Sequence, residues 1–125
     1  MKLKLYDPMT EEQFQQQCFL HAWNHESKFF RYRIFTIHNN AKDARQGLKL
    51  KSMGVLAGVP DMCIVLNYMK VIWIELKKDD KQKLSDAQKK LHGIWQLDFS
   101  HQIYIINTFD TFEHLIELIL KEYGK

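Results

Sequence analysis

Cysteine, proline and glycine are scarce in this sequence. Its 125 residues include two cysteines, two prolines and five glycines. Cys18 and Cys63 stand among apolar neighbours, as buried free thiols usually do, and two such residues do not make a disulfide framework. The low proline and glycine content, without repeats or low-complexity segments, argues against a fibrous or disordered chain. We therefore expect a folded protein from a reducing, cytoplasmic compartment.

Long hydrophobic runs and a dominant charge sign are also missing. The first ten residues, MKLKLYDPMT, lack the apolar centre of a signal peptide, and every apolar run falls far below the ~20 residues of a membrane span. We therefore expect no membrane contact. The net charge is only +3, from 18 basic and 15 acidic residues, which allows a polyanionic partner without demonstrating one.

The chain has enough length and apolar content for one hydrophobic core. Hydrophobic residues make up 46% of the sequence and charged residues 26%, as in ordinary globular proteins. A domain near this size buries roughly two-thirds of the surface that its unfolded chain exposes. We expect residues 1–125 to form a single domain.

Hydrophobic periodicity and turn residues predict alternating helices and strands. A helix is expected over 11–25, with Thr10 as its N-cap and Gln13 as the capping-box partner. The other predicted elements are a strand at 31–38, a short helix at 42–53, strands at 61–66 and 70–76, a helix at 85–97, a strand at 102–107 and a C-terminal helix. This order predicts the α/β class, with a mixed β-sheet flanked by helices.

A turn residue, a second capping box and two core residues are also predicted. Asn67 would supply the backbone freedom that the hairpin between the strands at 61–66 and 70–76 needs. Asp110 and Glu113 form a second capping-box pattern, at the start of the C-terminal helix. Trp95 and Phe99 are assigned to the hydrophobic core.

Residues 58–78, GVPDMCIVLNYMKVIWIELKK, place carboxylates in an apolar setting. Glu75 has apolar neighbours on both faces of its predicted strand, and period-two geometry points Glu75 and Lys77 to the same face, about 7 Å apart. Pairing of the two strands as a hairpin would place Asp61 opposite this pair. An ionised carboxylate left in an apolar sheet costs several kcal/mol unless it is neutralised. These acids therefore need a partner.

A divalent cation would remove this penalty. Oxygen ligands favour Mg²⁺ or Mn²⁺ over zinc, and Mg²⁺ typically binds one or two carboxylates together with substrate phosphates. We predict that Asp61 and Glu75 bind the metal for phosphodiester hydrolysis, while Lys77 orients the water or offsets developing charge. A structural ion pair between Glu75 and Lys77 is the alternative, but it leaves Asp61 without a partner.

These motifs resemble the PD-(D/E)XK nucleases and, within them, the VRR-NUC (virus-type replication-repair nuclease) group. GVPD with Asp61, and IELKK with Glu75 and Lys77, look like the two central motifs of the family. TEEQFQQ is similar to its first-helix pattern, which maps Glu11 to a metal ligand and Gln15 to its companion.

Two further segments extend the resemblance to about residues 10–120. LSDAQKKL resembles the family helix that carries a glutamine, here Gln88, and IHNNAKDARQGLKLKSMGVLAGVPD looks like the basic connection before the aspartate motif. The resemblance implies that nucleic acid contacts Gln15 and the polar residues of this connection: Asn39, Asn40, Lys42, Arg45, Lys49 and Lys51. These residues would contact phosphates without reading sequence. A solvated loop is the simpler alternative for the basic residues.

The resemblance also implies a function and a cellular setting. It implies a restriction-endonuclease-like fold and a Mg²⁺- or Mn²⁺-dependent deoxyribonuclease that cleaves branched, flap or junction DNA in replication, repair or recombination. A phage-like chain of this kind would act in the cytoplasm of the host cell, and short stand-alone members resemble homodimers. A non-catalytic nucleic-acid-binding module on the same fold, or a subunit of a larger repair machine, are the competing hypotheses.

Some of the implied site residues have simpler explanations. Glu11 and Glu12 both lie in a first helical turn, where the helix dipole alone favours acids, and either one could be the first-helix ligand. The Phe14-Gln15 spacing favours Glu11. Gln88, expected to be catalytic, could merely complete a capping box with Ser85.

Overall fold

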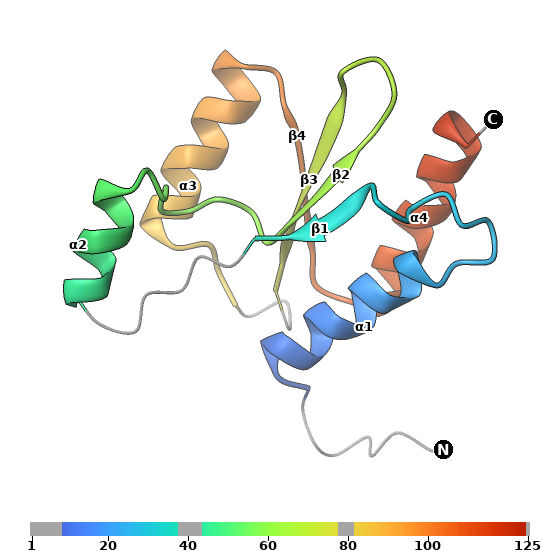
Figure 1. Cartoon of the computed structure of the whole chain (residues 1–125), viewed down its shortest axis with the longest axis horizontal. Coiled ribbons are helices and arrows are strands. Elements are labelled where there is room, and N and C mark those ends of the chain that lie inside the picture. Colours follow the sequence, from blue (N-terminus) through green and yellow to red (C-terminus); the bar gives the residue numbers. More distant parts are fainter. Residues whose placement is uncertain (1–8, 38–43, 78–81, 125) are drawn as a thin grey trace.

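A mixed β-sheet with helices on both faces forms the centre of this computed structural model, which describes residues 9–37, 44–77 and 82–124 (Figure 1). In these ranges the helices are α1 (Glu11–Trp23), α2 (Ala44–Ser52), α3 (Asp86–Gly93) with its π-helical extension η1 (Ile94–Asp98), and α4 (Phe109–Tyr123). The strands are β1 (Ile34–Thr36), β2 (Met62–Val65), β3 (Val71–Leu76) and β4 (Gln102–Ile106). The α/β class and the mixed sheet are confirmed.

The order of the strands across the sheet is β1-β2-β3-β4. β1 pairs with β2, and β2 with β3, in antiparallel fashion, whereas β4 runs parallel to β3 after the crossover through α3. Met62 pairs with Ile74, so Asp61, one residue before β2, lies opposite Glu75. The register predicted from the hairpin is therefore present, and it brings the two acids to the same end of the sheet.

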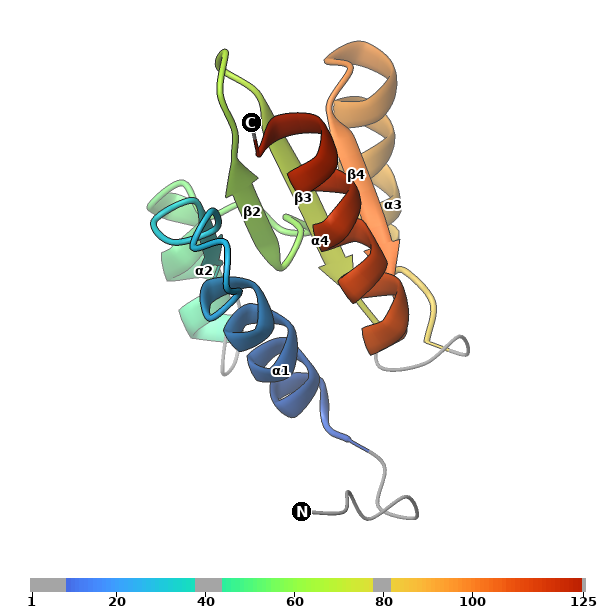
Figure 2. The same cartoon turned by 90° about the vertical axis from the view of Figure 1, so that its right-hand side faces the viewer.

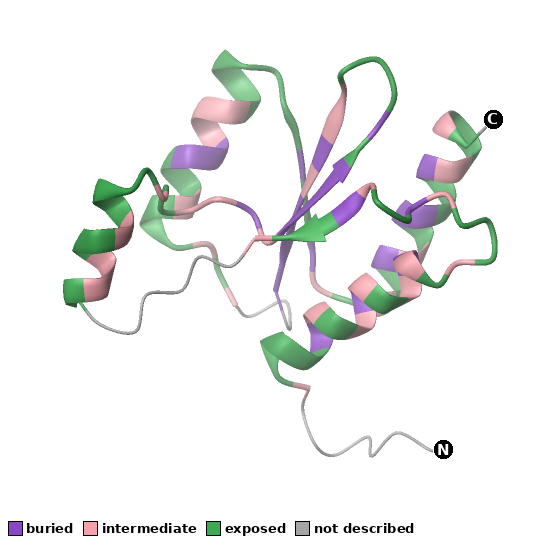
Figure 3. Cartoon of the chain, in the orientation of Figure 1, coloured by how far each residue is buried: buried purple, intermediate pink, exposed green. Residues whose placement is uncertain are grey.

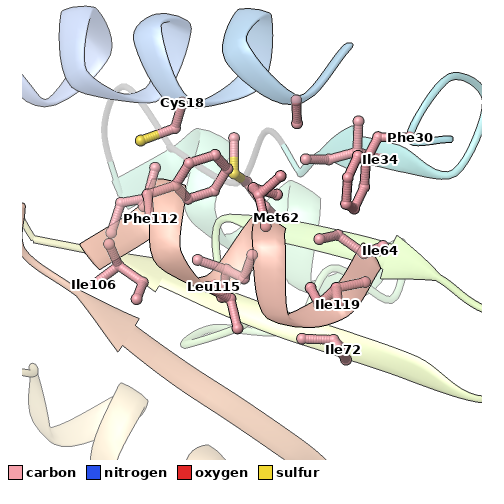
Figure 4. Close-up of a cluster of buried hydrophobic side chains, with 14 of the residues drawn as sticks. Cys18, Phe30, Ile34, Met62, Ile64, Ile72, Ile106, Phe112, Leu115 and Ile119 are labelled. Carbon is pink, nitrogen blue, oxygen red and sulfur yellow. The ribbon is translucent and has the colours of Figure 1, made fainter. Parts of the chain in front are cut away.

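The hydrophobic core lies between the sheet and the pair α1 and α4; in Figure 2, α4 lies in front of the sheet. Alternate residues of β2 and β3 point into this layer, where they meet the apolar faces of the two helices (Figure 4). Its buried members include Cys18, Phe30, Ile34, Met62, Ile64, Ile72, Ile74, Ile106, Phe112, Leu115, Ile116 and Ile119. Each large apolar side chain buried there contributes about 1.5–3 kcal/mol.

The opposite face of the sheet is covered less completely (Figure 3). It carries Trp73, whose ring centroid lies 4.8 Å from that of Trp95. α2 has no buried residue at all. The assignment of Phe99 to the core is wrong, because this residue follows η1 beyond the sheet and remains 61% exposed. No helix in the described parts of the chain has the length and apolar content needed to cross a bilayer.

Helix capping follows the sequence at two of three predicted sites. Thr10 accepts a hydrogen bond from the Gln13 amide at 3.1 Å, and the Ser85 capping box is also complete. α4, however, is capped by Thr108, whose backbone is extended and whose hydroxyl accepts from the Thr111 amide at 3.1 Å. Asp110 lies inside the first turn instead, where its charge suits the helix dipole.

Two loop predictions are corrected by the backbone. β1 is shorter than the predicted strand, because Tyr32 adopts a positive φ of 65° and the Arg33 amide closes a turn onto the Phe30 carbonyl. In the β2–β3 hairpin, Tyr68 and Met69 take the positive φ values that were expected of Asn67.

Candidate active site

A pocket of about 700 Å³ lies at the end of the sheet where β2 begins and β3 ends, beside the N-termini of α1 and α3. It is lined by Thr10, Glu11, Glu12, Phe14, Gln15, Asp61, Glu75, Leu76, Lys77 and Gln88. Every residue predicted to be catalytic or metal-binding is in this set. Four separate segments of the sequence therefore meet in one cavity.

Asp61 is positioned by the backbone on both sides. Its main-chain carbonyl accepts a hydrogen bond from the Ile37 amide at 2.8 Å, and its Oδ2 accepts one from the Leu76 amide at 2.7 Å. Burial raises the pKa of the Asp61 carboxyl, while the Leu76 amide opposes this shift. One Asp61 carboxylate oxygen is thus hydrogen-bonded to the backbone of β3.

Glu75 is buried with an incomplete set of partners. It is only 1% exposed, and its Oε1 accepts a hydrogen bond from the Gln88 side-chain amide. Its other oxygen, Oε2, is buried and has no hydrogen-bond partner among the described residues. Burial raises the pKa of Glu75 from 4.5 to about 8, and the charge of Asp61 adds to the shift. The site therefore disfavours two negative charges in the absence of a cation.

Lys77 places an ammonium beside these acids. Its Nζ lies 3.9 Å from Glu75 Oε1 and donates a hydrogen bond to Gln88 Oε1 at 3.0 Å. Lys77 is almost fully buried, and its main-chain amide donates to the Ile106 carbonyl at 2.9 Å, which fixes the end of β3 against β4. The side chain is therefore held in place at both its base and its tip.

Gln88 takes part both in the capping box of α3 and in the contacts of the pocket. Its Oε1 accepts from the Ser85 amide at 2.9 Å, which completes the capping box, and the same oxygen accepts from Lys77. Its side-chain amide donates to Glu75. The cap of α3 and the end of β3 thus share one glutamine.

His92 belongs to the same arrangement, although the sequence analysis did not identify it. This residue is buried one turn after Gln88, and its Nε2–H donates to the Gly58 carbonyl at 3.2 Å. Burial lowers the pKa of His92, which favours the neutral ring. Gly58 has a positive φ of 88°, and a Cβ there would lie 2.6 Å from the Ala87 carbonyl oxygen, so only glycine fits. The i, i+4 spacing of Gln88 and His92 is the sequence signal that could have identified it.

The first helix contributes its acidic turn to the rim of the pocket. Glu11 and Glu12 are both exposed, and Glu11 Oε1 accepts a hydrogen bond from the Gln82 side chain. Of these two acids, Glu11 is the one whose charge contributes to the raised pKa values of Asp61 and Glu75. This favours Glu11 as the third acidic residue of the pocket.

The predicted nucleic-acid contacts are only partly described. Asn39, Asn40 and Lys42 lie outside the described residues. Gln15 lines the pocket, whereas Arg45, Lys49 and Lys51 are exposed on α2, which stands apart from the sheet (Figure 1). α2 is therefore a basic surface beside the pocket and not part of its wall.

The pocket suits a hard divalent cation. The unpartnered Glu75 Oε2 and the neighbouring Asp61 carboxyl offer oxygen ligands whose pKa values are raised by burial. In the described ranges, no three Asp, Glu, His or Cys side chains already form a group that would enclose an ion. The residues that could hold an ion here are Asp61 and Glu75.

The fold that carries this pocket recurs in solved structures. The sequence matches no family model and no curated protein. Its structure is similar to a "VRR_NUC domain protein" with 24% identity and a TM-score of 0.72, over 92% of this chain and 91% of that one. It is also similar to a "VRR_NUC domain" with 17% identity and a TM-score of 0.51, over 82% of this chain and 92% of that one.

These likenesses define the class of fold first, a restriction-endonuclease-like α/β domain with a mixed sheet. More particularly, the chain has the VRR-NUC fold over nearly its whole length. The fold implied by the motif resemblance is confirmed.

Proposed function

We propose that this protein is a metal-dependent deoxyribonuclease of the VRR-NUC type. The observation that carries the proposal is the buried Glu75 carboxyl, which faces Asp61 and Lys77 in one open pocket and leaves an oxygen without a partner. A purely structural ion pair does not explain a second, partly buried acid in the same place. A site for a cation and a phosphodiester explains all three side chains.

Asp61 and Glu75 would hold a Mg²⁺ or Mn²⁺ ion, with Glu11 at the rim as a further ligand. When bound, the ion supplies Lewis-acid polarisation of the phosphate and a water of lowered pKa. The two carboxyls are preorganised by the Leu76 amide and by Gln88. Neutralising their repulsion links ion binding to the stability of the fold.

Lys77 and Gln88 are the other polar residues of the pocket that would take part in the reaction. The Lys77 ammonium can donate a hydrogen bond to the attacking water or to the phosphate oxygen on which charge develops. Gln88 accepts from Lys77 and donates to Glu75, and so it fixes the position of both groups. The low exposure of Lys77 strengthens these interactions.

The proposed contacts with DNA follow from the positive charge of α2. Arg45 and Lys49, one turn apart on α2, would contact the phosphates of DNA outside the pocket together with Lys51. Structure-selective cleavage of flaps or junctions, and a homodimer as the active assembly, are parts of the same proposal that rest on the family resemblance alone.

A cleavage panel tests this proposal. Purified protein is incubated with single-stranded, duplex, flap and four-way DNA in Mg²⁺, Mn²⁺ or EDTA. We expect cleavage with either ion, none with EDTA, and none by the Asp61→Asn or Lys77→Met variants. Equal cleavage by the Asp61→Asn variant would reveal a contaminating nuclease. Tight DNA binding without cleavage in either ion would support the non-catalytic module instead.

A further inference from the structure

The tip of the β2–β3 hairpin carries unusual residues for its backbone. Tyr68 and Met69 both have a φ of 61°, and the Lys70 amide donates to the Asn67 carbonyl at 3.3 Å. Positive φ at both central residues is the signature of a type I′ turn, which strongly prefers Asn-Gly. Bulky residues with a Cβ are strained in this region. The chain thus keeps two large side chains where smaller ones would be more stable.

These two side chains are also fully in solvent. Tyr68 is 94% exposed and Met69 102% exposed, so neither gains packing energy that would offset the strain. Strained residues with no internal purpose are typical of binding surfaces. The tip joins the end of β2 to the start of β3, as Figures 1 and 2 show, whereas Asp61 precedes β2 and Glu75 lies near the end of β3.

Two cations adjoin the tip. Lys70 follows Met69 directly, and its Nζ lies 5.3 Å from the centroid of the Tyr123 ring. The Arg33 guanidinium donates to the Val65 carbonyl at 3.3 Å and to Asn67 Oδ1 at 3.2 Å. Glu122 of α4 is an acid whose charge reaches Lys70. The balance at the tip favours an anionic partner with apolar faces.

We propose that Tyr68 and Met69 form a wedge that contacts the bases of DNA, while the surrounding cations contact its phosphates. Nucleic acid combines an anionic backbone with flat apolar bases, and stacking on aromatic rings and insertion of apolar side chains between base steps are established modes of recognition. The proposal rests on the proposed nuclease function. It adds a second point of contact, which acts on the bases and not on the scissile phosphate.

The strand length sets the spacing of the two contacts. Glu75 lies six positions after Met69, which corresponds to about 20 Å along an extended strand. That distance equals roughly six base pairs of duplex. A DNA arm lying along the sheet would thus have its bases disturbed about half a helical turn from the cleavage point.

A double substitution removes both the two wedge side chains and the backbone strain of the turn. Tyr68→Asn with Met69→Gly installs the preferred turn sequence and removes both side chains. In the Asp61→Asn background, with Mg²⁺ present, we measure binding to a forked duplex that carries 2-aminopurine at single positions near the fork. We expect the double variant to melt roughly 5 °C higher, to bind about ten- to a hundredfold more weakly, and to lose the 2-aminopurine signal.

Matched variants complete the test. Tyr68→Phe keeps the ring and should bind normally. Tyr32→Asn relieves a similar positive φ of 65° at a similarly exposed tyrosine outside the β2–β3 hairpin, and should also bind normally. A double variant that is more stable yet binds DNA like its parent would overturn the wedge while leaving the nuclease proposal intact. Absence of cleavage by the wild-type chain would instead overturn the nuclease proposal.

Discussion

The two ends of strands β2 and β3 differ in how they store unfavourable free energy. At the pocket end the cost is electrostatic, because Glu75 is buried opposite the partly buried Asp61 and lacks a partner for one oxygen among the described residues. At the hairpin end the cost is conformational, because Tyr68 and Met69 are strained and exposed. The pocket end is held by many hydrogen bonds, and the hairpin end by few. A ligand bound at the pocket end and a ligand bound at the hairpin end could therefore each offset the unfavourable free energy of that end independently of the other.

The largest effect is expected from removing the charges of the pocket end. Asp61→Asn and Lys77→Met should each lower kcat for DNA cleavage by about a thousandfold or more, because each removes a group placed at the reacting phosphate. Steady-state cleavage rates measure the loss. Asp86→Asn, an acid on the same helix as Gln88 but absent from the pocket lining, is the control and should cleave normally.

The pH dependence of stability is the next largest effect. The folded pKa of Glu75 lies above its usual value of 4.5, at about 8, so its contribution to stability is complete below about 4.5 and is lost as the pH rises through about 8. The metal-free protein should therefore lose a few kcal/mol of unfolding free energy over this range. Urea denaturation at a series of pH values in EDTA measures it. Glu75→Gln should flatten the curve, and an unchanged slope would contradict the assignment.

Substitutions at Ser85 and Gln88 distinguish a role in helix capping from a role in catalysis. Ser85→Ala removes a cap contact alone and should lower stability by about 1 kcal/mol with little change in kcat. Gln88→Leu removes the contacts to Lys77 and Glu75 as well, and should lower kcat by about ten- to a hundredfold. Equal kcat values for the two variants would show that Gln88 is only a capping residue.

The smallest effect should come from His92, which acts on Asp61 through Gly58. His92→Leu removes the donor to the Gly58 carbonyl and should weaken Mn²⁺ binding severalfold, whereas His92→Gln, which retains a donor of similar reach, should restore it. Calorimetric titration with Mn²⁺ measures both. If His92→Gln binds as weakly as His92→Leu, the hydrogen bond is not what positions the loop.

The pocket could be predicted from sequence because its geometry follows from local periodicity. Alternation along β3 placed Glu75 and Lys77 on one face, and hairpin pairing brought Asp61 opposite them. The first turn of α1 was recognisable from Thr10 and Gln13, which both signal a helix start. The roles of these residues in catalysis stay predictions.

Other features depend on contacts between distant segments and left little trace in the sequence. The hydrogen bond from His92 to Gly58 joins residues 34 positions apart. Tyr68 and Met69 contradict the residue preferences of their turn, so preference alone pointed to Asn67. Phe99 resembled a core residue in composition, but only the path of the chain after η1 shows that no element covers it. Sequence-based prediction failed at these residues because the fold or the function overrides local residue preferences there.

The most direct measurement is a calorimetric and thermal titration of Mn²⁺ into the wild-type chain and the Glu75→Gln variant at pH 8. The account predicts that wild type binds the ion and melts higher with it, while Glu75→Gln melts higher than wild type without ion and gains little on addition. Identical ion binding by the two proteins, or a Glu75→Gln variant less stable than wild type in EDTA, would contradict the claim that Glu75 and Asp61 are arranged for a cation.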